Sequence, residues 1–245
     1  MTRLIIANWK MNPETLVEAR HLVVGVEQGL FGLDRRGVEV AICPPFVFLP
    51  ALMHSLHFAT LGAQNVSAQE KGPYTGEVSA GQLSALQVRF AIVGHSERRA
   101  LGEDNEFINE KIKICLKRKI EPILCVGFGV KKNMSEQAVK KFIKKQLRED
   151  LRGLDAKLKT TVAYEPAWGI STGLGSAKTI SVQHCVNIIE FIKEQTPRAR
   201  VIYGASVTSK NASELASHNS IEGCLVGGAS LDATEFLKII KEFSN

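Results

Sequence analysis

The middle of the chain carries the stretch Ala163-Tyr-Glu-Pro-Ala-Trp-Gly-Ile-Ser-Thr-Gly173. An apolar, β-prone run from Thr160 to Tyr164 leads into it and places Glu165 at the end of a strand. Pro166 stops that strand because proline has no N–H to donate to a sheet. The sheet therefore fixes Glu165, whereas the glycine-bearing residues from Pro166 to Ser176 are free to move over it. The pattern indicates a base with a lid, although alone it also fits a surface acid in a turn.

Short apolar runs that resemble the one before Glu165 recur along the whole sequence. They are rich in Val, Ile and Leu without polar alternation, which is typical of parallel strands covered on both faces. The eight runs are Leu4–Ala7, Val38–Ile42, Ala59–Gly62, Arg89–Val93, Pro122–Val126, Thr160–Tyr164, Arg200–Tyr203 and Gly223–Val226.

Amphipathic segments lie between these runs. Helical spacing relates the apolar residues of 182–192 and of 236–243, and Asp232 and Glu235 have the spacing of a capping box ahead of the second segment. The chain has 245 residues and no Pro/Gly/Ser-rich linker. Eight βα units in one undivided chain predict an α/β fold, a single-domain (β/α)8 TIM barrel over 1–245. A doubly wound open sheet is the alternative topology.

A barrel of this kind has its active site at the carboxyl ends of its strands. Polar or glycine residues follow six of the eight runs directly, which is more than isolated turns would give. They are Asn8 and Lys10, Gln64 and Asn65, His95, Glu165, Ser206, and Gly227 with Gly228. We therefore expect these residues to meet at one rim.

The residue types at this rim favour acid–base chemistry close to a phosphate. Metal-ligand clusters, a Ser-His-Asp order, a Walker loop and a G-x-G-x-x-G turn after the first strand are missing from the sequence, so we predict neither a metal nor a cofactor. Glu165 is the strand-end carboxylate that precedes a lid, and Lys10 is a cation able to stabilise an oxyanion, with Glu97 as its charge partner. Backbone N–H groups held by Gly227 and Gly228, beside Ser206, suit a phosphate dianion.

Composition excludes several other classes of protein. The net charge is +6, but the basic residues are dispersed without interleaved aromatics, so we expect no nucleic acid partner. The densest basic group, within 140–148, has apolar residues at helical spacing between its cations and is interpreted as a solvated helix face. Five cysteines without a C-x-x-C pair predict buried, reduced thiols. The apolar run 4–7 is too short for a signal sequence or a membrane span, so a cytoplasmic protein is expected.

Five segments, taken in order, resemble the signature segments of the triosephosphate isomerase family across almost the whole chain. They are Asn8-Trp-Lys-Met-Asn12, Gly94-His-Ser-Glu-Arg-Arg99, the stretch around Glu165, Tyr203-Gly-Ala-Ser-Val207 and Leu225-Val-Gly-Gly-Ala-Ser230. The resemblance implies a cofactor-free isomerase of dihydroxyacetone phosphate and glyceraldehyde 3-phosphate. Glu165 would be the base, His95, followed by Ser96, the neutral electrophile, and Asn8 and Lys10 the substrate contacts. This division of roles is the known one for triosephosphate isomerases and does not follow from the spacing alone.

Further roles come only from that resemblance. Ile170 and Leu225 would be apolar neighbours of the base, and Ser171 would bind the phosphate. Gly173, Tyr203 and Ser206 would hold the closed lid, and Trp168 would donate to a family glutamate when the lid is closed. The long segment 64–79, which contains Gln64, Asn65 and Thr75, would be the loop that enters a second copy of the chain in a homodimer.

The chain departs from the family around the lid. The family usually has Ile-Gly-Thr-Gly-Lys-Thr-Ala where this chain has Ile170-Ser-Thr-Gly-Leu-Gly-Ser176, so Ser171, Leu174, Gly175 and Ser176 differ. Phe128 replaces a glutamate, and Ala205 replaces a glycine beside Ser206. A serine is less free than glycine to aim its N–H, so we expect an active enzyme with a more weakly held lid. An isomerase of another short sugar phosphate, or a barrel kept for binding after loss of catalysis, are the alternatives.

Overall fold

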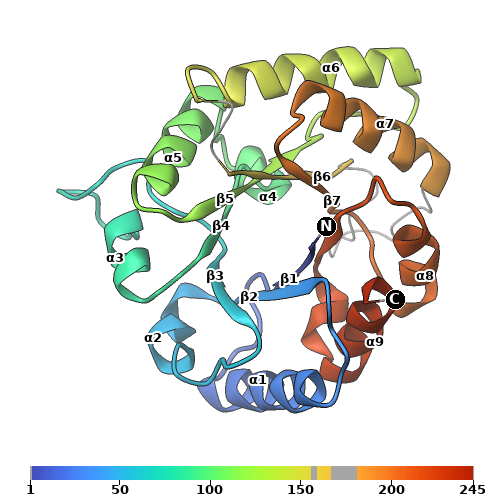
Figure 1. Cartoon of the computed structure of the whole chain (residues 1–245). Coiled ribbons are helices and arrows are strands. Elements are labelled where there is room, and N and C mark those ends of the chain that lie inside the picture. The colour runs from blue at the N-terminus through green and yellow to red at the C-terminus, as the bar shows by residue number, and fades with distance from the viewer. Residues whose placement is uncertain (1, 156–158, 167–180, 245) are drawn as a thin grey trace.

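The computed structural model describes residues 2–155, 159–166 and 181–244. Eight parallel strands close into a barrel in the chain order β1 to β8, and the helices form a ring around it (Figure 1). The predicted (β/α)8 barrel is therefore confirmed, and the open doubly wound sheet is excluded because β1 pairs with both β2 and β8. The strands are β1 Arg3–Asn8, β2 Val38–Cys43, β3 Thr60–Ala63, β4 Phe90–Val93, β5 Glu121–Val126, β6 Thr161–Tyr164, β7 Arg200–Tyr203 and β8 Gly223–Val226.

The helices of the described part cover the outside of the barrel. They are α1 Leu16–Phe31, α2 Leu49–Leu52, α3 Ala80–Ala85, α4 Ser96–Ala100, α5 Asn105–Lys117, α6 Glu136–Asp150, α7 Val182–Gln195, α8 Ser209–Ser217 and α9 Ala233–Phe243, with short 3-10 turns at η1 Phe46–Phe48 and η3 Gly228–Leu231. Each predicted strand is present with its ends shifted by at most one residue. The apolar periods predicted in 182–192 and 236–243 become the buried faces of α7 and α9.

The core has two layers because side chains alternate along each strand. Leu4 and Ile6 of β1 point into the barrel, where they join a cluster that contains Phe90, Ile92 and Cys125. Ile5 and Ala7 point outward and pack with the helices in the larger cluster. The inside of the barrel is thus filled by side chains, so a ligand that contacts the sheet binds at the ends of the strands and not within the barrel.

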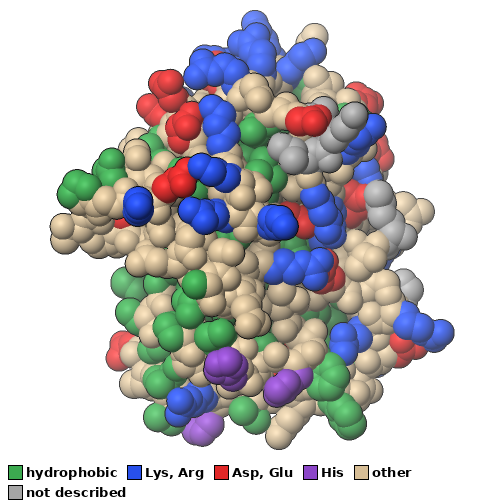
Figure 2. Space-filling model, turned by 60° about the vertical axis from the view of Figure 1, so that its left-hand side comes forward, with side chains coloured by type: hydrophobic (Ala, Val, Ile, Leu, Met, Phe, Trp, Pro, Cys, Tyr) green, Lys and Arg blue, Asp and Glu red, His purple; other side chains and the backbone are tan. Residues whose placement is uncertain are grey.

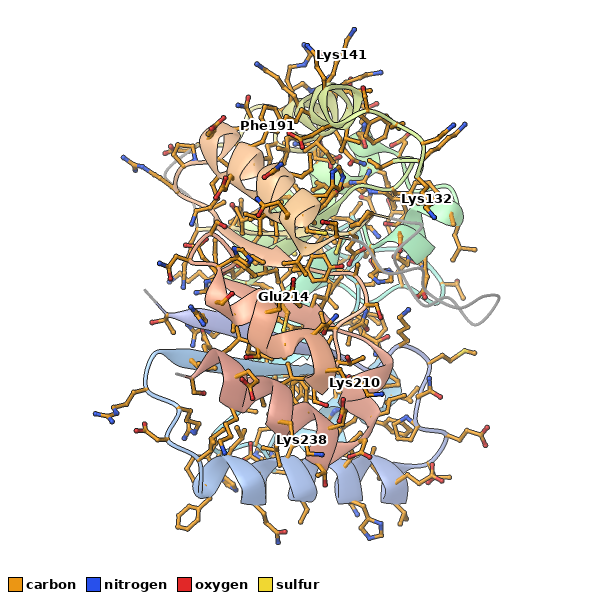
Figure 3. The ribbon with its side chains drawn as sticks, turned by 90° about the vertical axis from the view of Figure 1, so that its right-hand side faces the viewer. Lys132, Lys141, Phe191, Lys210, Glu214 and Lys238 are labelled. Carbon is orange, nitrogen blue, oxygen red and sulfur yellow. The ribbon has the colours of Figure 1, made fainter. Side chains whose placement is uncertain are left out.

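The basic helix face and the cysteines behave as predicted. Helix α6 buries Val139, Ile143 and Leu147, while four of its basic side chains are exposed and that of Lys140 is half-buried. Lys141 points away from the molecule (Figure 3), and a group of basic side chains occupies the top of the view in Figure 2. The five cysteines are free and buried.

Two other features bear on function. Residues 64–79 contain neither a helix nor a strand and project from the barrel (Figure 1). Among the described helices, none is both long and apolar enough to cross a bilayer.

Candidate active site

Glu165 lies at the centre of the rim, directly after β6. Its backbone N–H donates to Val126 O at 2.7 Å, which continues the pairing of β6 with β5 by one residue. The side chain is buried, and Ser96 N donates to Oε2 at 3.3 Å. His95 Nε2 lies 3.7 Å from Oε1. The predicted base and the predicted electrophile therefore face each other across the rim.

Two glycines make room for the glutamate. A Cβ added to Gly204 would lie 2.7 Å from Glu165 Cγ, and one added to Gly127 would lie 2.6 Å from Glu165 O. Gly127 also has φ +115°, a backbone conformation that favours glycine. Below these residues, burial and the neighbouring carboxylate of Glu165 raise the pKa of the Cys125 thiol. The Cys125 thiol therefore stays protonated and does not act as a base in place of Glu165.

His95 is the N-cap residue of α4 and is buried. The backbone N–H of Glu97 donates to His95 Nδ1 at 3.3 Å, so Nδ1 acts as an acceptor. In a neutral imidazole the proton is then on Nε2, the nitrogen that points toward Glu165. The fold thus presents an N–H donor, rather than a second acceptor, beside the carboxylate.

Lys10 follows β1 in an unusual conformation. Its φ is +53°, a left-handed value that is uncommon for a lysine. Asn8 Oδ1 accepts from Lys10 N at 3.2 Å, and Gln64 Nε2 donates to the carbonyls of Lys10 at 2.8 Å and Cys43 at 2.9 Å. The predicted ion pair is confirmed, because Lys10 Nζ lies 2.7 Å from Glu97 Oε1. These contacts hold the ammonium group at the rim.

A cavity of about 200 Å³ opens beside these groups. It brings together residues from the ends of four strands, namely Asn8, Lys10, His95, Gly204, Ala205, Ser206, Val207, Thr208, Leu225, Gly227, Gly228 and Ala229. The predicted phosphate-binding groups Ser206, Gly227 and Gly228 thus line the same space as Asn8, Lys10 and His95. The two glycines have no atom that an added Cβ would touch closely, apart from Lys10 Cε at 3.6 Å from Gly227, so their backbone is open to a ligand.

Other predicted residues lie elsewhere. Asn65 Oδ1 accepts from the buried ammonium of Lys111 at 2.8 Å, and Thr75 is exposed on the projecting loop, so neither lines the cavity. Gln64 serves the Lys10 turn in addition to starting that loop. Tyr203 is buried at the end of β7. The lid residues Trp168, Ile170, Ser171, Gly173, Leu174, Gly175 and Ser176 lie outside the described residues.

Sequence reasoning missed one residue that shapes the rim. The Arg99 side chain is buried and donates to Gly94 O at 2.9 Å, Cys125 O at 3.1 Å and Asp150 Oδ2 at 2.6 Å. It therefore ties the ends of β4 and β5 to α6, directly behind His95 and Glu165. The sequence gives no reason to expect that Arg99 is buried, because arginine side chains are mostly exposed.

Comparison with known proteins agrees with this geometry. The family model described as "Triosephosphate isomerase" matches residues 3–243. The chain belongs to the triosephosphate isomerase family. Triosephosphate isomerases from Nitrosococcus oceani, Dehalococcoides mccartyi and Aquifex aeolicus are 39%, 40% and 38% identical to it. These alignments cover 97%, 99% and 99% of this chain and 97%, 97% and 100% of the relatives.

Two departures from the family pattern lie within the described residues. Phe128 follows β5 and is 36% exposed, while Ala205 is buried in the wall of the cavity. Within the described part of the chain, His, Cys, Asp and Glu side chains do not gather in threes that could hold a metal ion.

The glycine beside the base gives a direct test of the geometry. Gly204→Ala should displace the Glu165 side chain, because the new methyl group would overlap Cγ, and we expect turnover of triose phosphate to fall by about 10- to 100-fold. Steady-state kinetics, with circular dichroism to verify folding, measure this. Gly32→Ala is the control, since Gly32 ends α1 with φ −87° and has no close neighbour. Equal turnover in both variants would show that Gly204 does not position the base.

Proposed function

We propose that this chain is a triosephosphate isomerase that interconverts dihydroxyacetone phosphate and D-glyceraldehyde 3-phosphate through an enediolate. The observation that carries the proposal is the approach of His95 Nε2 to within 3.7 Å of Glu165 Oε1 beside a cavity that also contains Lys10. A buried base, an N–H donor and a cation converge there on a space sized for a small substrate.

In this mechanism Glu165 removes a proton from the carbon next to the substrate carbonyl. The electron pair of that C–H bond moves into a C–C double bond, and the carbonyl oxygen gains negative charge. His95 Nε2–H donates to this oxygen and polarises it. The hydroxyl proton on the carbon that lost its hydrogen then passes to the former carbonyl oxygen, and Glu165 returns its proton to the former carbonyl carbon, so the ketone and the aldehyde interconvert with atoms and charges balanced. All these groups belong to the chain, so we propose that the reaction needs no cofactor.

Lys10 and Asn8 stabilise the developing oxyanion in this proposal. The Lys10 ammonium is a fixed positive charge at the cavity, and its pairing with Glu97 limits its motion. Because Asn8 Oδ1 is occupied by Lys10 N, the amide Nδ2 of Asn8 is the group left to donate to substrate. Fixed donors of this kind stabilise charge that forms during the reaction.

The phosphate group of the substrate would bind on the opposite wall of the cavity. Ser206 follows β7, and Gly227 and Gly228 follow β8, where phosphate sites recur in barrels. Ser171 is proposed as a further contact and Pro166 to Ser176 as the lid that excludes water, with Leu225 and Ile170 beside the base. We also propose that the enzyme works in the cytoplasm, in glycolysis and gluconeogenesis.

Glu165→Gln tests the assignment of the base. The amide keeps the shape of the side chain but cannot take a proton, so we expect kcat to fall by roughly 100- to 10,000-fold. A coupled assay with glycerol-phosphate dehydrogenase measures the rate, and Glu214→Gln, an exposed acid on α8, is the matched control. If Glu165→Gln keeps near-normal turnover, another group is the base.

The projecting loop supports a homodimer. Residues 64–79 leave the barrel without a helix or a strand, and Tyr74 at the tip is 45% exposed. Met11 and Val47, which follow β1 and β2, are 91% and 78% exposed. In the proposed dimer a partner subunit would cover these large apolar side chains. We propose that Thr75 enters the neighbouring subunit near Lys10.

Analytical ultracentrifugation tests the dimer. We expect a particle of twice the chain mass of 26.8 kDa at micromolar concentration, because a long loop without secondary structure needs a partner to support it. Replacing 70–77 by a short Gly-Ser linker should give a monomer. A full-length chain that sediments at 26.8 kDa while fully active would contradict the proposal.

A further inference from the structure

We infer that Glu235 on α9 is a positioning residue for the phosphate site, acting with Asn211 to hold the loop after β7 against the loop after β8. The inference rests on the proposed function, since it takes Ser206, Gly227 and Gly228 as the phosphate-binding groups. It adds two residues outside the cavity that fix the relative position of its two phosphate-binding walls.

Asn211 forms the first link, on the β7 side. Its Nδ2 donates to Ser206 O at 2.9 Å, and its Oδ1 accepts from Thr208 N at 2.8 Å. One amide side chain therefore closes the turn from Ser206 to Thr208, which enters α8. Ser206, Val207 and Thr208 line the cavity, so the shape of this turn sets one part of the cavity wall.

Glu235 forms the second link, between the two loops. Its Oε1 accepts from Ser209 N at 2.8 Å, and its Oε2 accepts from Ser209 Oγ at 3.0 Å. Both carboxylate oxygens of one residue on α9 thus bind the first residue of α8. The two helices lie side by side along this side of the barrel (Figures 1 and 3).

This contact corrects the capping box predicted from the sequence. Asp232 does cap α9, because its Oδ1 accepts from Glu235 N at 3.0 Å. The return bond from the Glu235 side chain to the backbone of Asp232 does not form in the described structure, since both carboxylate oxygens bind Ser209. The Glu235 side chain thus links α9 to α8 and does not cap its own helix.

A short, hydrogen-bonded segment connects the loop after β8 to α9, the helix that carries Glu235. Ser230 N and Ser230 Oγ donate to Gly227 O at 2.8 Å and 2.7 Å, which closes the turn that holds Gly228. The helix α9 starts directly after this turn, at Ala233. A movement of α8 away from α9 would therefore separate Ser206 from Gly227 and Gly228.

The charge of Glu235 contributes to the link. Hydrogen bonds from the backbone and side chain of Ser209 lower the pKa of Glu235, and the nearby Lys238 acts in the same direction while Asp232 opposes it. Glu235 is therefore ionised at neutral pH, and hydrogen bonds to a charged acceptor are stronger than those to a neutral one.

Glu235→Gln tests the inference in the full-length chain. The amide can accept only on one side, so we expect the dissociation constant of inorganic phosphate, from calorimetry, and KM for dihydroxyacetone phosphate each to rise roughly 3- to 10-fold. Turnover of D-glyceraldehyde, which has no phosphate, should not change. Ser209→Ala should weaken phosphate binding less, and its effect should be reduced in the Glu235→Gln background, because both changes act on one contact.

Asp232→Ala is the matched control, since it removes the cap of the same helix without touching Ser209. It should lower the melting temperature and leave phosphate affinity unchanged. The inference is overturned if Glu235→Gln lowers only the melting temperature, or if it slows D-glyceraldehyde as much as the phosphorylated substrate. Calorimetry measures phosphate binding without any turnover. A wild-type chain that binds phosphate but has no isomerase activity would therefore refute the proposed function and leave the role of Glu235 in phosphate binding open to the same test.

Discussion

The contact between the Glu165 carboxylate and the first residues of α4 is the interaction on which the rest of the site depends. Glu165 follows β6 and His95 follows β4, the two strands that flank β5. The barrel closure sets the distance between these strand ends, and the N–H of Ser96 fixes one carboxylate oxygen. Glycines at Gly204 and Gly127 leave space for the side chain. This arrangement buries the base directly beside His95, which lines the cavity.

Ion pairs also join the amino ends of the strands, opposite the candidate site. At the amino ends of the strands, Glu39 of β2 lies 2.8 Å from Arg89 Nη1 and 3.5 Å from Arg200 Nη1 of β7. This carboxylate links β2 with the starts of β4 and β7. These three strands are far apart in the sequence. At the carboxyl ends, by contrast, the structure keeps a left-handed Lys10 and glycines with open backbone. Such conformations persist because surrounding groups, here Asn8 and Gln64, hold them in place.

Much of the fold could be predicted because the period of apolar residues reports the strands directly. The same argument placed Asn8, Lys10, His95, Ser206 and the two glycines at one rim, and the cavity does contain them. Once a barrel was assumed, Glu165 and His95 could be expected to lie near each other, but the distance between their side chains could not be predicted. Residues such as Glu165 and His95 were found because they come directly after a strand.

The remaining contacts could not be read from local pattern because they join segments distant in sequence. Gln64 was predicted at the rim and at the start of the projecting loop, but its hydrogen bond to the Lys10 backbone, 54 positions away, was not predicted. Glu235 has the spacing of a capping box, yet its carboxylate binds Ser209 on another helix. Arg99 carries no periodic signal, although it joins two strand ends to α6. In each case local propensity permits several partners, and the tertiary packing selects one.

The central claim is that this rim catalyses proton transfer in a triose phosphate, and the purified wild-type chain tests it most directly. A dehydrogenase-coupled assay, in buffer containing EDTA, should show conversion of dihydroxyacetone phosphate and of D-glyceraldehyde 3-phosphate in both directions, with the same rate before and after dialysis. A chain that binds phosphate but converts neither triose would contradict the account and leave a barrel that only binds its ligand.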